Sequence, residues 1–424
     1  MPTFGLPIIA SLILDIIYTK FSKLSCDTRL ALGNNKKSIG LISYTNFNIS
    51  KNGLSQYIID LLQNVQEQGL RVRSLFHINK DECNAVIGYF VISLMKILII
   101  KLSSIGDLVH TIPAYKLLQK TLNSEQTKVD WLVYESLAPT LYKSINKENL
   151  ISLKDRKLSS LIQKATELKN KYDYVIDLQG LFKTALISKI IAPNANYGFK
   201  KPREAWASYF YKESFCDYKS LESKKHVIEQ NLELTTNFIK SITLKEPSLE
   251  IDFSIEQLHC SSSKKSICFI PATTWESKHW DLKNWLELIN RLDEAKYDFF
   301  MTGSPANLDY LNKIKDSSSK KINIITNKKL EDLYDFYQTM DIIIGVDTGP
   351  LHIAAAALYE QRANKKIIGL YGPSSGSRSG PYGFTAISAD QLFNLKASNK
   401  KTYTQDNNSI NRINPELVIN ELNV

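Results

Sequence analysis

Residues 96–111, KILIIKLSSIGDLVHT, decide the fold class of this chain. The run 97–100 is apolar at every position, which is typical of a strand that is covered on both faces of its sheet. A short turn with Gly106 follows, and a segment of helical period begins near Asp107. A buried strand, a glycine-bearing turn and a helix in this order predict a βαβ unit on a parallel sheet. Ligands of such open α/β folds bind at the carboxyl ends of the strands, where this turn lies.

The same alternation of apolar runs and helical segments continues along the chain and stops once, in the polar, Ser-rich stretch 242–265 that carries Pro247. This break is typical of an interdomain linker. The sequence therefore predicts an α/β protein with two domains, at residues 95–245 and 266–424, and a linker at 246–265. The predicted strands are 96–101, 129–133, 174–177, 266–270, 297–301, 321–325, 341–345 and 366–370, and the predicted helices are 108–121, 158–171, 181–191, 226–239, 284–293, 330–339, 350–358 and 415–422.

Composition excludes several classes of protein. Of the 424 residues, 43% are hydrophobic and 23% are charged, near globular averages, which excludes a disordered, fibrous or multi-spanning membrane chain. The apolar run 5–17 contains Asp15 and is shorter than the about 20 residues that span a bilayer, and it lacks the basic start of a signal peptide. Five scattered cysteines without a CxxC pair predict a reduced, cytoplasmic protein. The net charge of +10 fits acidic partners such as nucleotides, phosphorylated sugars or an anionic membrane surface.

Residues 1–94 form an N-terminal extension without this regular alternation. The segment 38–76 can be read as strand–loop–helix–strand and faintly resembles the beginning of the lipid A tetraacyldisaccharide kinases. Its loop, Ser50–Ser55, lacks the Gly-Lys-Thr ending that binds phosphate. We therefore expect a non-catalytic appendage, or a start codon assigned upstream of the true one.

Two strand-end segments carry residues suited to chemistry in the first and second predicted domains. Asp107 falls in the first turn of a helix, where a carboxylate is either a reactive group or a helix cap. In the segment 271–280, the hydroxyl groups of Thr273 and Thr274 and the charge of Lys278 suit a diphosphate.

Two further strand-end segments contain glycine. In 345–356, Pro350 at the first helical position and free backbone N–H groups are typical of an anion-binding helix start, whereas a lone His352 in such a helix is usually structural. The segment 369–376 is a glycine-rich loop of the same kind. No GxGxxG is present, so dinucleotide binding is not indicated.

Taken together, these segments resemble the lipopolysaccharide heptosyltransferases of glycosyltransferase family 9, from residue 95 to about residue 383, and most of all the heptosyltransferase I branch. The resemblance rests on KLSSIGDLVHTIPA (101–114), DLQGLFK (177–183), ATT (272–274) with KHW (278–280), and VDTG (346–349) with His352.

The resemblance implies a GT-B fold, in which two Rossmann-like domains with parallel sheets face each other across a cleft. The first domain would bind the acceptor and the second the nucleotide sugar. The implied reaction is an inverting transfer of heptose from ADP-L-glycero-D-manno-heptose to Kdo of lipid A in lipopolysaccharide inner-core synthesis, with neither a cofactor nor a metal. The implied location is the cytoplasmic face of the inner membrane, as a peripheral protein without a nucleic-acid partner, and the oligomeric state is left open.

The resemblance also implies roles for individual residues. Asp107 would be the general base, and Lys278 would assist departure of the diphosphate. Asn307 is a departure, since the family pattern has a glutamate here that reaches the ribose. Lys154, Lys157 and Arg203 would bind acidic groups of the acceptor, although a solvated basic face explains them equally well. The implied donor-binding residues are Ser103, Ser104, Gly106, Thr273, Thr274, Lys278, Asn307, Asp347, Thr348, Gly349 and His352.

Two alternatives stay open at this point. One is a related transferase that uses another nucleotide sugar, such as a hexose donor. The other is an inactive relic that binds sugar nucleotides. The joint presence of Asp107, Thr273, Lys278 and Asp347 argues against the relic, because a decaying site is expected to lose some of its residues.

Overall fold

The computed structural model describes the backbone of residues 29–31, 41–45, 71–78 and 85–93, and describes residues 95–122, 127–217, 225–243, 245–258, 264–395 and 408–423 with their side chains. The chain forms two compact units. One contains residues 1–97, 118–129 and 238–248, and the other contains residues 98–117, 130–237 and 249–424. The loop Ser50–Ser55 lies outside the described residues, and the domain boundaries expected above stay a prediction.

The first of two parallel sheets has six strands in the order β10-β9-β8-β5-β6-β7. The pairs β10–β9, β9–β8 and β6–β7 run parallel, as the βαβ pattern predicts. The strands are β5 (Met95–Ile100), β6 (Thr127–Tyr134), β7 (Leu150–Leu153), β8 (Tyr174–Asp177), β9 (Asn196–Lys201) and β10 (Glu213–Asp217).

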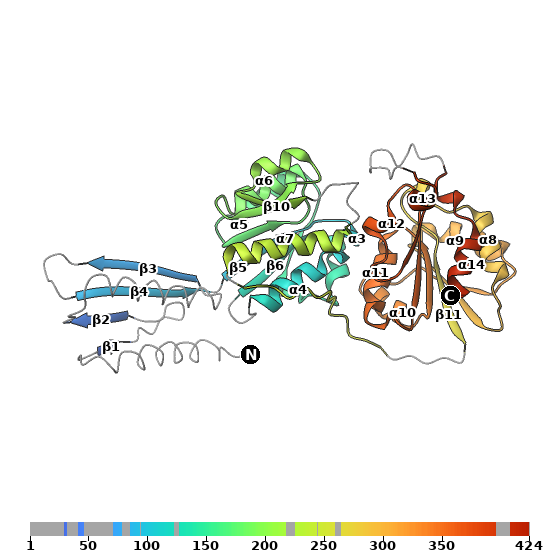
Figure 1. Cartoon of the computed structure of the whole chain (residues 1–424), viewed down its shortest axis with the longest axis horizontal. Helices are drawn as coiled ribbons and strands as arrows, with labels where there is room; N and C mark the ends of the chain where they lie inside the picture. Colours follow the sequence, from blue (N-terminus) through green and yellow to red (C-terminus); the bar gives the residue numbers. More distant parts are fainter. Residues whose placement is uncertain are drawn as a thin grey trace. The chain divides into compact units, whose positions relative to one another are not determined.

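Helices cover both faces of this sheet (Figure 1). The helices α5 (Leu158–Leu168) and α6 (Phe182–Ile191) bury their apolar residues against one face, in a cluster that includes Leu98, Ile100 and Val175. The opposite face is covered by α4 (Ile112–Thr121), whose Tyr115 ring lies 6.0 Å from the Trp131 ring, and by α7 (Val227–Ile242). This two-sided cover explains why the strand at 97–100 is apolar throughout.

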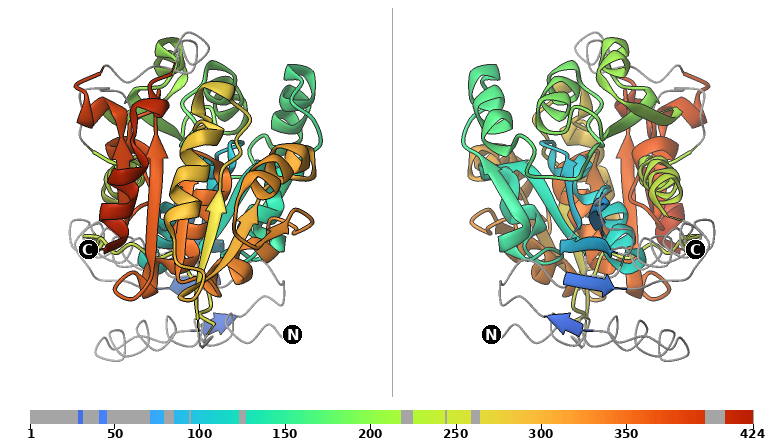
Figure 2. Two further views of the ribbon diagram at one scale, coloured as in Figure 1. Left: turned by 90° about the vertical axis from the view of Figure 1, so that its right-hand side faces the viewer. Right: turned by 90° about the vertical axis from the view of Figure 1, so that its left-hand side faces the viewer.

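The second sheet is fully parallel, with the strand order β13-β12-β11-β14-β15-β16. One face of this sheet is covered by α8 (Leu282–Arg291), α9 (Leu308–Ser317) and α14 (Pro415–Asn423), as the left-hand view of Figure 2 shows. These helices and the strands bury one large apolar core between them. The helices α10 (Asp332–Gln338) and α11 (Gly349–Leu358) bury side chains outside this core, and the Tyr337 hydroxyl lies 3.1 Å from Thr302 Oγ1. The strands are β11 (Lys265–Ile270), β12 (Tyr297–Thr302), β13 (Ile322–Ile325), β14 (Ile342–Val346), β15 (Lys366–Tyr371) and β16 (Thr385–Ser388).

The N-terminal region contains a separate antiparallel sheet of four strands in the order β1-β2-β4-β3. Its strands are β1 (Arg29–Ala31), β2 (Leu41–Thr45), β3 (Arg71–Ile78) and β4 (Ala85–Ser93). Among the described residues, no helix is long and apolar enough to span a bilayer.

The α/β class and the two parallel sheets confirm the predicted fold, but several elements differ from the prediction. The helix predicted over 108–121 is two helices, α3 (Ile105–Val109) and α4, because Pro113 lacks the N–H that a helix interior needs and falls in the first turn of α4. The sequence did not predict the strands β1, β4, β7, β9, β10 and β16. It also did not predict the helices α9, α12 (Gly376–Ser379) and α13 (Ala389–Leu392).

Candidate active site

The loop after β5 is held by the loop after β8. Gln179 Oε1 accepts hydrogen bonds from the backbone N–H groups of Leu102 and Ser103, at 3.0 and 3.3 Å. Lys101 is fully buried, and its Nζ donates to the carbonyl oxygen of Leu178 at 2.6 Å. Both strands end at the carboxyl edge of the sheet, so side chains of one loop can satisfy the backbone of the other.

Asp107 lies in the first turn of α3, as expected. Its Oδ2 accepts hydrogen bonds from Ser104, from the backbone N–H at 3.0 Å and from the hydroxyl at 3.2 Å, and together they form a capping box. Arg203 Nη1 lies 3.8 Å from the same oxygen. None of the described residues donates a hydrogen bond to Oδ1, so this oxygen is available to accept a proton.

The charge state of Asp107 follows from its neighbours. Burial raises the pKa of the carboxyl group, but the positive charges of Lys101 and Arg203 and the hydrogen bonds from Ser104 lower the pKa by more. The pKa of Asp107 therefore lies below its usual value, and the group is ionised at neutral pH. The side chain of Asp107 is 21% exposed, so it is partly open to solvent.

Asp177, the last residue of β8, fixes the second loop. Its Oδ1 accepts hydrogen bonds from the N–H groups of Gln179 and Gly180, and its Oδ2 accepts one from the Tyr211 hydroxyl at 2.8 Å. Gly180 adopts φ +68°, a conformation that favours glycine. Burial raises the pKa of Asp177. The DLQG segment thus has a structural role in positioning the Asp107 loop, and the contributions of Gln179 and Tyr211 were not predicted.

In the second sheet, Asp347 follows β14 and is enclosed by three side chains. Lys278 Nζ and Ser374 Oγ both donate to Oδ2, each at 2.5 Å, and His352 Nε2 lies 3.6 Å from Oδ1. Burial raises the pKa of Asp347, but the charge of Lys278 and the contact with His352 lower it well below its usual value. The sequence predicted that Lys278 and Asp347 both belong to the donor site, but not that they form an ion pair. Ser374 lies in the glycine-rich segment after β15, which had been singled out without a role for that residue.

The remaining predicted donor residues lie in strand-end loops of the same sheet. The Thr273 carbonyl oxygen lies 2.8 Å from His279 Nε2, and Thr274 is exposed. Asn307 Oδ1 accepts hydrogen bonds from the Ser304 N–H at 3.1 Å and its hydroxyl at 2.6 Å, so the amide closes a local turn. Thr348 is the residue that precedes α11.

The helices α3 and α11 lie in contact because of two glycines. A Cβ atom on Gly106 would lie 2.4 Å from His352 Cδ2, and a Cβ atom on Gly349 would lie 2.7 Å from Ile105 Cβ. Neither position accepts a side chain without displacement of its neighbour. The two glycines of the motifs SIGD and DTG therefore bring the Asp107 loop and the Asp347 loop together.

Three histidine rings pack beside this contact. The His110 ring lies 4.5 Å from the His352 ring and 5.1 Å from the His226 ring, in edge-on arrangements. His226 Nδ1 accepts the N–H of Ile228, so the proton assigned to Nε2 is donated to the carbonyl oxygen of Gly380, at 3.1 Å. Burial lowers the pKa of His226 to about 4 and lowers that of His110 well below its usual value. His110 and His226 are thus neutral at neutral pH.

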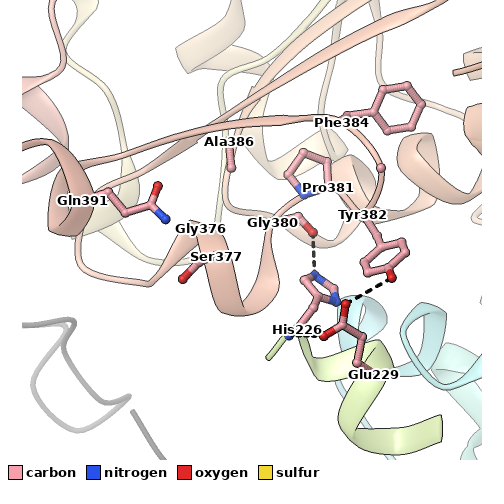
Figure 3. Close-up of a pocket in the computed structure, with 11 residues that line it drawn as sticks. His226, Glu229, Gly376, Ser377, Gly380, Pro381, Tyr382, Phe384, Ala386 and Gln391 are labelled. Carbon is pink, nitrogen blue, oxygen red and sulfur yellow. Dashed lines mark hydrogen bonds between the residues drawn. The ribbon is translucent and has the colours of Figure 1, made fainter. Parts of the chain in front are cut away.

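A pocket of about 340 Å³ lies beside His226 (Figure 3). It is lined by His226 and Glu229 of the α7 region and by residues of the segment 376–391, and the Tyr382 hydroxyl donates to Glu229 Oε1 at 3.3 Å. None of the predicted site residues lines this pocket. We therefore place the candidate active site at the α3–α11 contact and not in this pocket.

The predicted acceptor residues are only partly brought together. Arg203 reaches Asp107, whereas Lys154 and Lys157 have exposed side chains after β7 and before α5. Two cations that were not predicted converge on Tyr134 at the end of β6: Lys183 Nζ lies 3.2 Å from the hydroxyl, and the Arg156 guanidinium lies 5.3 Å from the ring centroid. The carboxyl edge of this sheet is therefore basic around Asp107 and Tyr134.

Among the residues with described side chains, no group of three or more His, Cys, Asp or Glu side chains is placed to hold a metal ion. Transfer without a metal or a cofactor stays a prediction.

The sequence model of glycosyltransferase family 9 (heptosyltransferase) matches residues 162–409 of this chain. Lipopolysaccharide heptosyltransferase 1 of Salmonella typhimurium is 28% identical over 306 residues, which cover 68% of this chain and 92% of that protein. The enzyme of the same name from Campylobacter coli is 28% identical over 308 residues, covering 67% of this chain and 86% of that protein. The structure of the Escherichia coli heptosyltransferase WaaC with ADP aligns with a TM-score of 0.60 at 22% identity, over 78% of this chain and 99% of that one.

Proposed function

This chain belongs to glycosyltransferase family 9, the heptosyltransferase family, and from that premise we propose that it transfers a heptose from ADP-L-glycero-D-manno-heptose to Kdo of lipid A. The relatives named above are lipopolysaccharide heptosyltransferases, and this chain matches 92% and 86% of their lengths. The observation that carries the proposal is the α3–α11 contact. There, Gly106 packs on His352 and Gly349 packs on Ile105, so that an ionised Asp107 lies beside the loop that contains Asp347.

In the proposed reaction, Asp107 acts as the general base. The acceptor hydroxyl oxygen attacks the anomeric carbon of the heptose, the bond from that carbon to the β-phosphate oxygen breaks, and ADP leaves with the bonding electrons. The hydroxyl proton passes to Asp107, where Oδ1 accepts no hydrogen bond from the described residues. A single displacement of this kind inverts the anomeric centre. A positioned base contributes about 10²–10⁴-fold to the rate.

On the donor side, Lys278 is proposed to stabilise the diphosphate that departs. Its ammonium group is already placed by Asp347, at 2.5 Å. A cation that is fixed before the reaction stabilises developing phosphate charge without further reorganisation. Thr273, Thr274 and the N–H groups at the start of α11 are proposed to contact the same diphosphate.

On the acceptor side, Arg203 is the most direct candidate for a carboxylate or phosphate of the acceptor. Its guanidinium lies 3.8 Å from Asp107, so a bound anion there would hold the acceptor close to the base. Lys183 and Arg156 around Tyr134 extend this basic edge. Lys154 and Lys157 are proposed as outer contacts.

The protein is further proposed to act as a peripheral protein on the cytoplasmic face of the inner membrane, where a lipid A acceptor is embedded. We expect exposed positive charge to hold it there. At about 1 M salt, the screening length falls to about 3 Å. A high-salt wash of isolated membranes should therefore release the protein, and release by detergent alone would contradict charge-based attachment.

The proposed transfer is tested by mass spectrometry of the products formed from Kdo-lipid A and a panel of nucleotide sugars. A mass gain of one heptose with ADP-heptose as the effective donor is the expected result. A mass gain from a hexose donor would instead favour a related transferase that uses another nucleotide sugar. No mass gain with any donor would favour an inactive relic that binds sugar nucleotides.

One observation favours the alternative of a related transferase that uses another nucleotide sugar as its donor. Asn307 stands where the family pattern has a glutamate, and its side-chain oxygen is engaged by Ser304. An amide lacks the charge with which a carboxylate binds a ribose hydroxyl strongly. An Asn307→Glu variant should therefore bind ADP more tightly by calorimetry if the position faces the ribose.

A further inference from the structure

The surface around the 3-10 helix η3 (Ala205–Phe210) exposes large aromatic rings. Trp206 is 71% exposed and Tyr209 is 80% exposed, and their ring centroids lie 5.8 Å apart. Phe182, at the start of α6, is 42% exposed. These three rings, together with the exposed Lys200 and Lys212, are called here the aromatic–basic surface.

The aromatic–basic surface is firmly anchored. The helix η3 buries Ala207 against Ala185 of α6 and against Tyr211, and Phe210 packs on the same cluster. The Phe182 and Phe210 rings meet edge-on at 5.2 Å. Glu204 Oε2 accepts the Phe182 N–H at 2.7 Å, and Asn196 Nδ2 donates to the Phe210 carbonyl oxygen at 2.7 Å. The exposed rings therefore sit on packed structure and are presented together.

The charge of the chain is concentrated in the half that carries this surface. Residues 95–245 contain 24 Lys and Arg against 15 Asp and Glu, whereas residues 246–424 contain 20 against 22. The aromatic–basic surface also has acidic neighbours, since Lys201 pairs with Asp217 at 2.7 Å, and Glu204 and Glu213 are exposed. With Arg203 included, residues 200–217 carry four Lys and Arg against three Asp and Glu, so the local balance is positive by one charge.

We propose that the aromatic–basic surface docks on an anionic lipid bilayer. Trp and Tyr are the side chains that partition to the headgroup level of a membrane, because each joins an apolar ring to a polar group. Lysines beside them are attracted by the negative surface potential of anionic lipids. A protein partner fits less well, because lysine is depleted at protein–protein interfaces.

The position of the surface connects docking with the candidate active site. Arg203 lies in the same connection, between β9 and η3, and its guanidinium is 3.8 Å from Asp107. Docking through Trp206 and Tyr209 therefore brings the base to the level of a membrane-embedded acceptor. The docking names a surface for the membrane attachment proposed above, and this last step also rests on the proposed sugar transfer.

The first experiment measures binding of the full chain to sedimented phosphatidylcholine vesicles with and without phosphatidylglycerol, which contain no sugar acceptor. The expected result is binding that requires phosphatidylglycerol and that falls at least about tenfold in the Trp206→Ala/Tyr209→Ala double variant, since two rings lose their apolar contact with the bilayer. The matched control is Leu392→Ala/Phe393→Ala, which removes two exposed apolar side chains, 46% and 38% exposed, from the other half of the chain. This control should bind as the unchanged protein does.

The second experiment uses tryptophan fluorescence. Of the five tryptophans, Trp131, Trp280 and Trp285 are fully buried and Trp275 is half-buried, so Trp206 is the one placed to meet lipid. Brominated lipids should quench the emission of the bound protein. Trp206→Phe should retain vesicle binding, since an aromatic ring remains, and should lose the quenching.

Several outcomes would overturn the docking proposal. The proposal is wrong if the Trp206→Ala/Tyr209→Ala variant binds vesicles as well as the unchanged protein, if vesicle binding does not depend on phosphatidylglycerol, or if the unchanged protein does not bind vesicles. It is also wrong if the protein forms a dimer in solution that this variant dissociates, without any binding to vesicles. If the docking is right and the proposed transfer is wrong, the vesicle results hold and no sugar is transferred. If both are right, the double variant loses transfer to a vesicle-embedded acceptor and keeps transfer to the deacylated, water-soluble one.

Discussion

Asp107 and Asp347 occupy matching places in the two parallel sheets, and their surroundings differ. Each lies in the loop or first turn between a strand end and a helix at the carboxyl edge of its sheet. Asp107 is 21% exposed and has one oxygen without a donor among the described residues, with a guanidinium at 3.8 Å. Asp347 is 11% exposed and is enclosed by Lys278, Ser374 and His352.

This difference shows that the topology of the sheet determines where a carboxylate lies, whereas the side chains around it determine which chemical role it can take. Both groups have pKa values below the usual one, so both are ionised at neutral pH. Asp107 is the more exposed of the two and has an oxygen without a donor among the described residues, which suits its proposed role as the base. Asp347 neutralises a buried ammonium and thereby fixes the position of Lys278.

The sharpest test of this comparison is Asp107→Asn. Asparagine caps a helix about as well as aspartate, so stability should hardly change. The loss of proton-accepting power should lower turnover by about 10²–10⁴-fold, with donor affinity nearly unchanged. Product formation and calorimetry of donor binding measure the two quantities. Turnover near that of the unchanged protein would reduce Asp107 to a helix cap.

In contrast to Asp107→Asn, Asp347→Asn should change the stability of the fold. The substitution leaves the buried Lys278 ammonium without its counter-charge, which is expected to lower the free energy of unfolding by about 3–5 kcal/mol. Urea titration at neutral pH measures this. The double variant Asp347→Asn/Lys278→Met should recover part of the loss, because it removes the uncompensated charge. If Asp347→Asn costs less than about 1 kcal/mol, the enclosure of Asp347 does not stabilise the fold.

The histidine cluster predicts that stability falls in acid. Unfolded histidine has a pKa of about 6.5, whereas the pKa of His226 in the folded chain is about 4, so the unfolded state binds more protons between these values. Stability is therefore lost as the pH falls from about 6.5 towards about 4, by about 2 kcal/mol at pH 5 from this residue. His226→Gln should show a smaller difference between urea titrations at pH 7 and pH 5. An equal difference in both proteins would mean that His226 does not contribute to the acid sensitivity.

The smallest effect is expected for removal of residues 1–94. The first strand of the parallel sheet begins at Met95, and the extension lacks a complete phosphate loop. A chain that starts at Met95 should fold and keep most of its transfer activity, as measured by circular dichroism and product formation. An insoluble or inactive product, beside an active full chain, would show that the extension is needed.

The sequence predicted the central elements well, because their signals are local. The central strands β5, β8, β11, β14 and β15 are runs of apolar residues, and the structure has them within one or two residues of the predicted ranges. Of the four edge strands of the two parallel sheets, β13 was predicted and β7, β10 and β16 were not. β7 and β10 have only four and five residues and are partly exposed, so neither an apolar run nor a strict alternation marks them.

For the candidate site, the sequence predicted the strand-end motifs but not their contacts. Asp107 at a helix start, and the glycines of SIGD and DTG, could be read from spacing. The pairing of Lys278 with Asp347 joins residues 69 positions apart, and the contact of Arg203 with Asp107 joins residues far apart in the chain. No local pattern encodes such pairs.

The sequence by itself determined that two parallel sheets form, and which strand ends carry polar and glycine residues, because backbone propensity and apolar periodicity act over a few neighbours. Only the tertiary structure decided which carboxylate stays accessible and which is enclosed. It also decided that Gly106 and Gly349 serve to let α3 and α11 touch, and that Trp206 and Tyr209 face outward while their neighbours Ala207 and Tyr211 are buried. The physical reason is that burial, desolvation and charge pairing depend on what packs against a residue, and that is fixed when distant segments fold together.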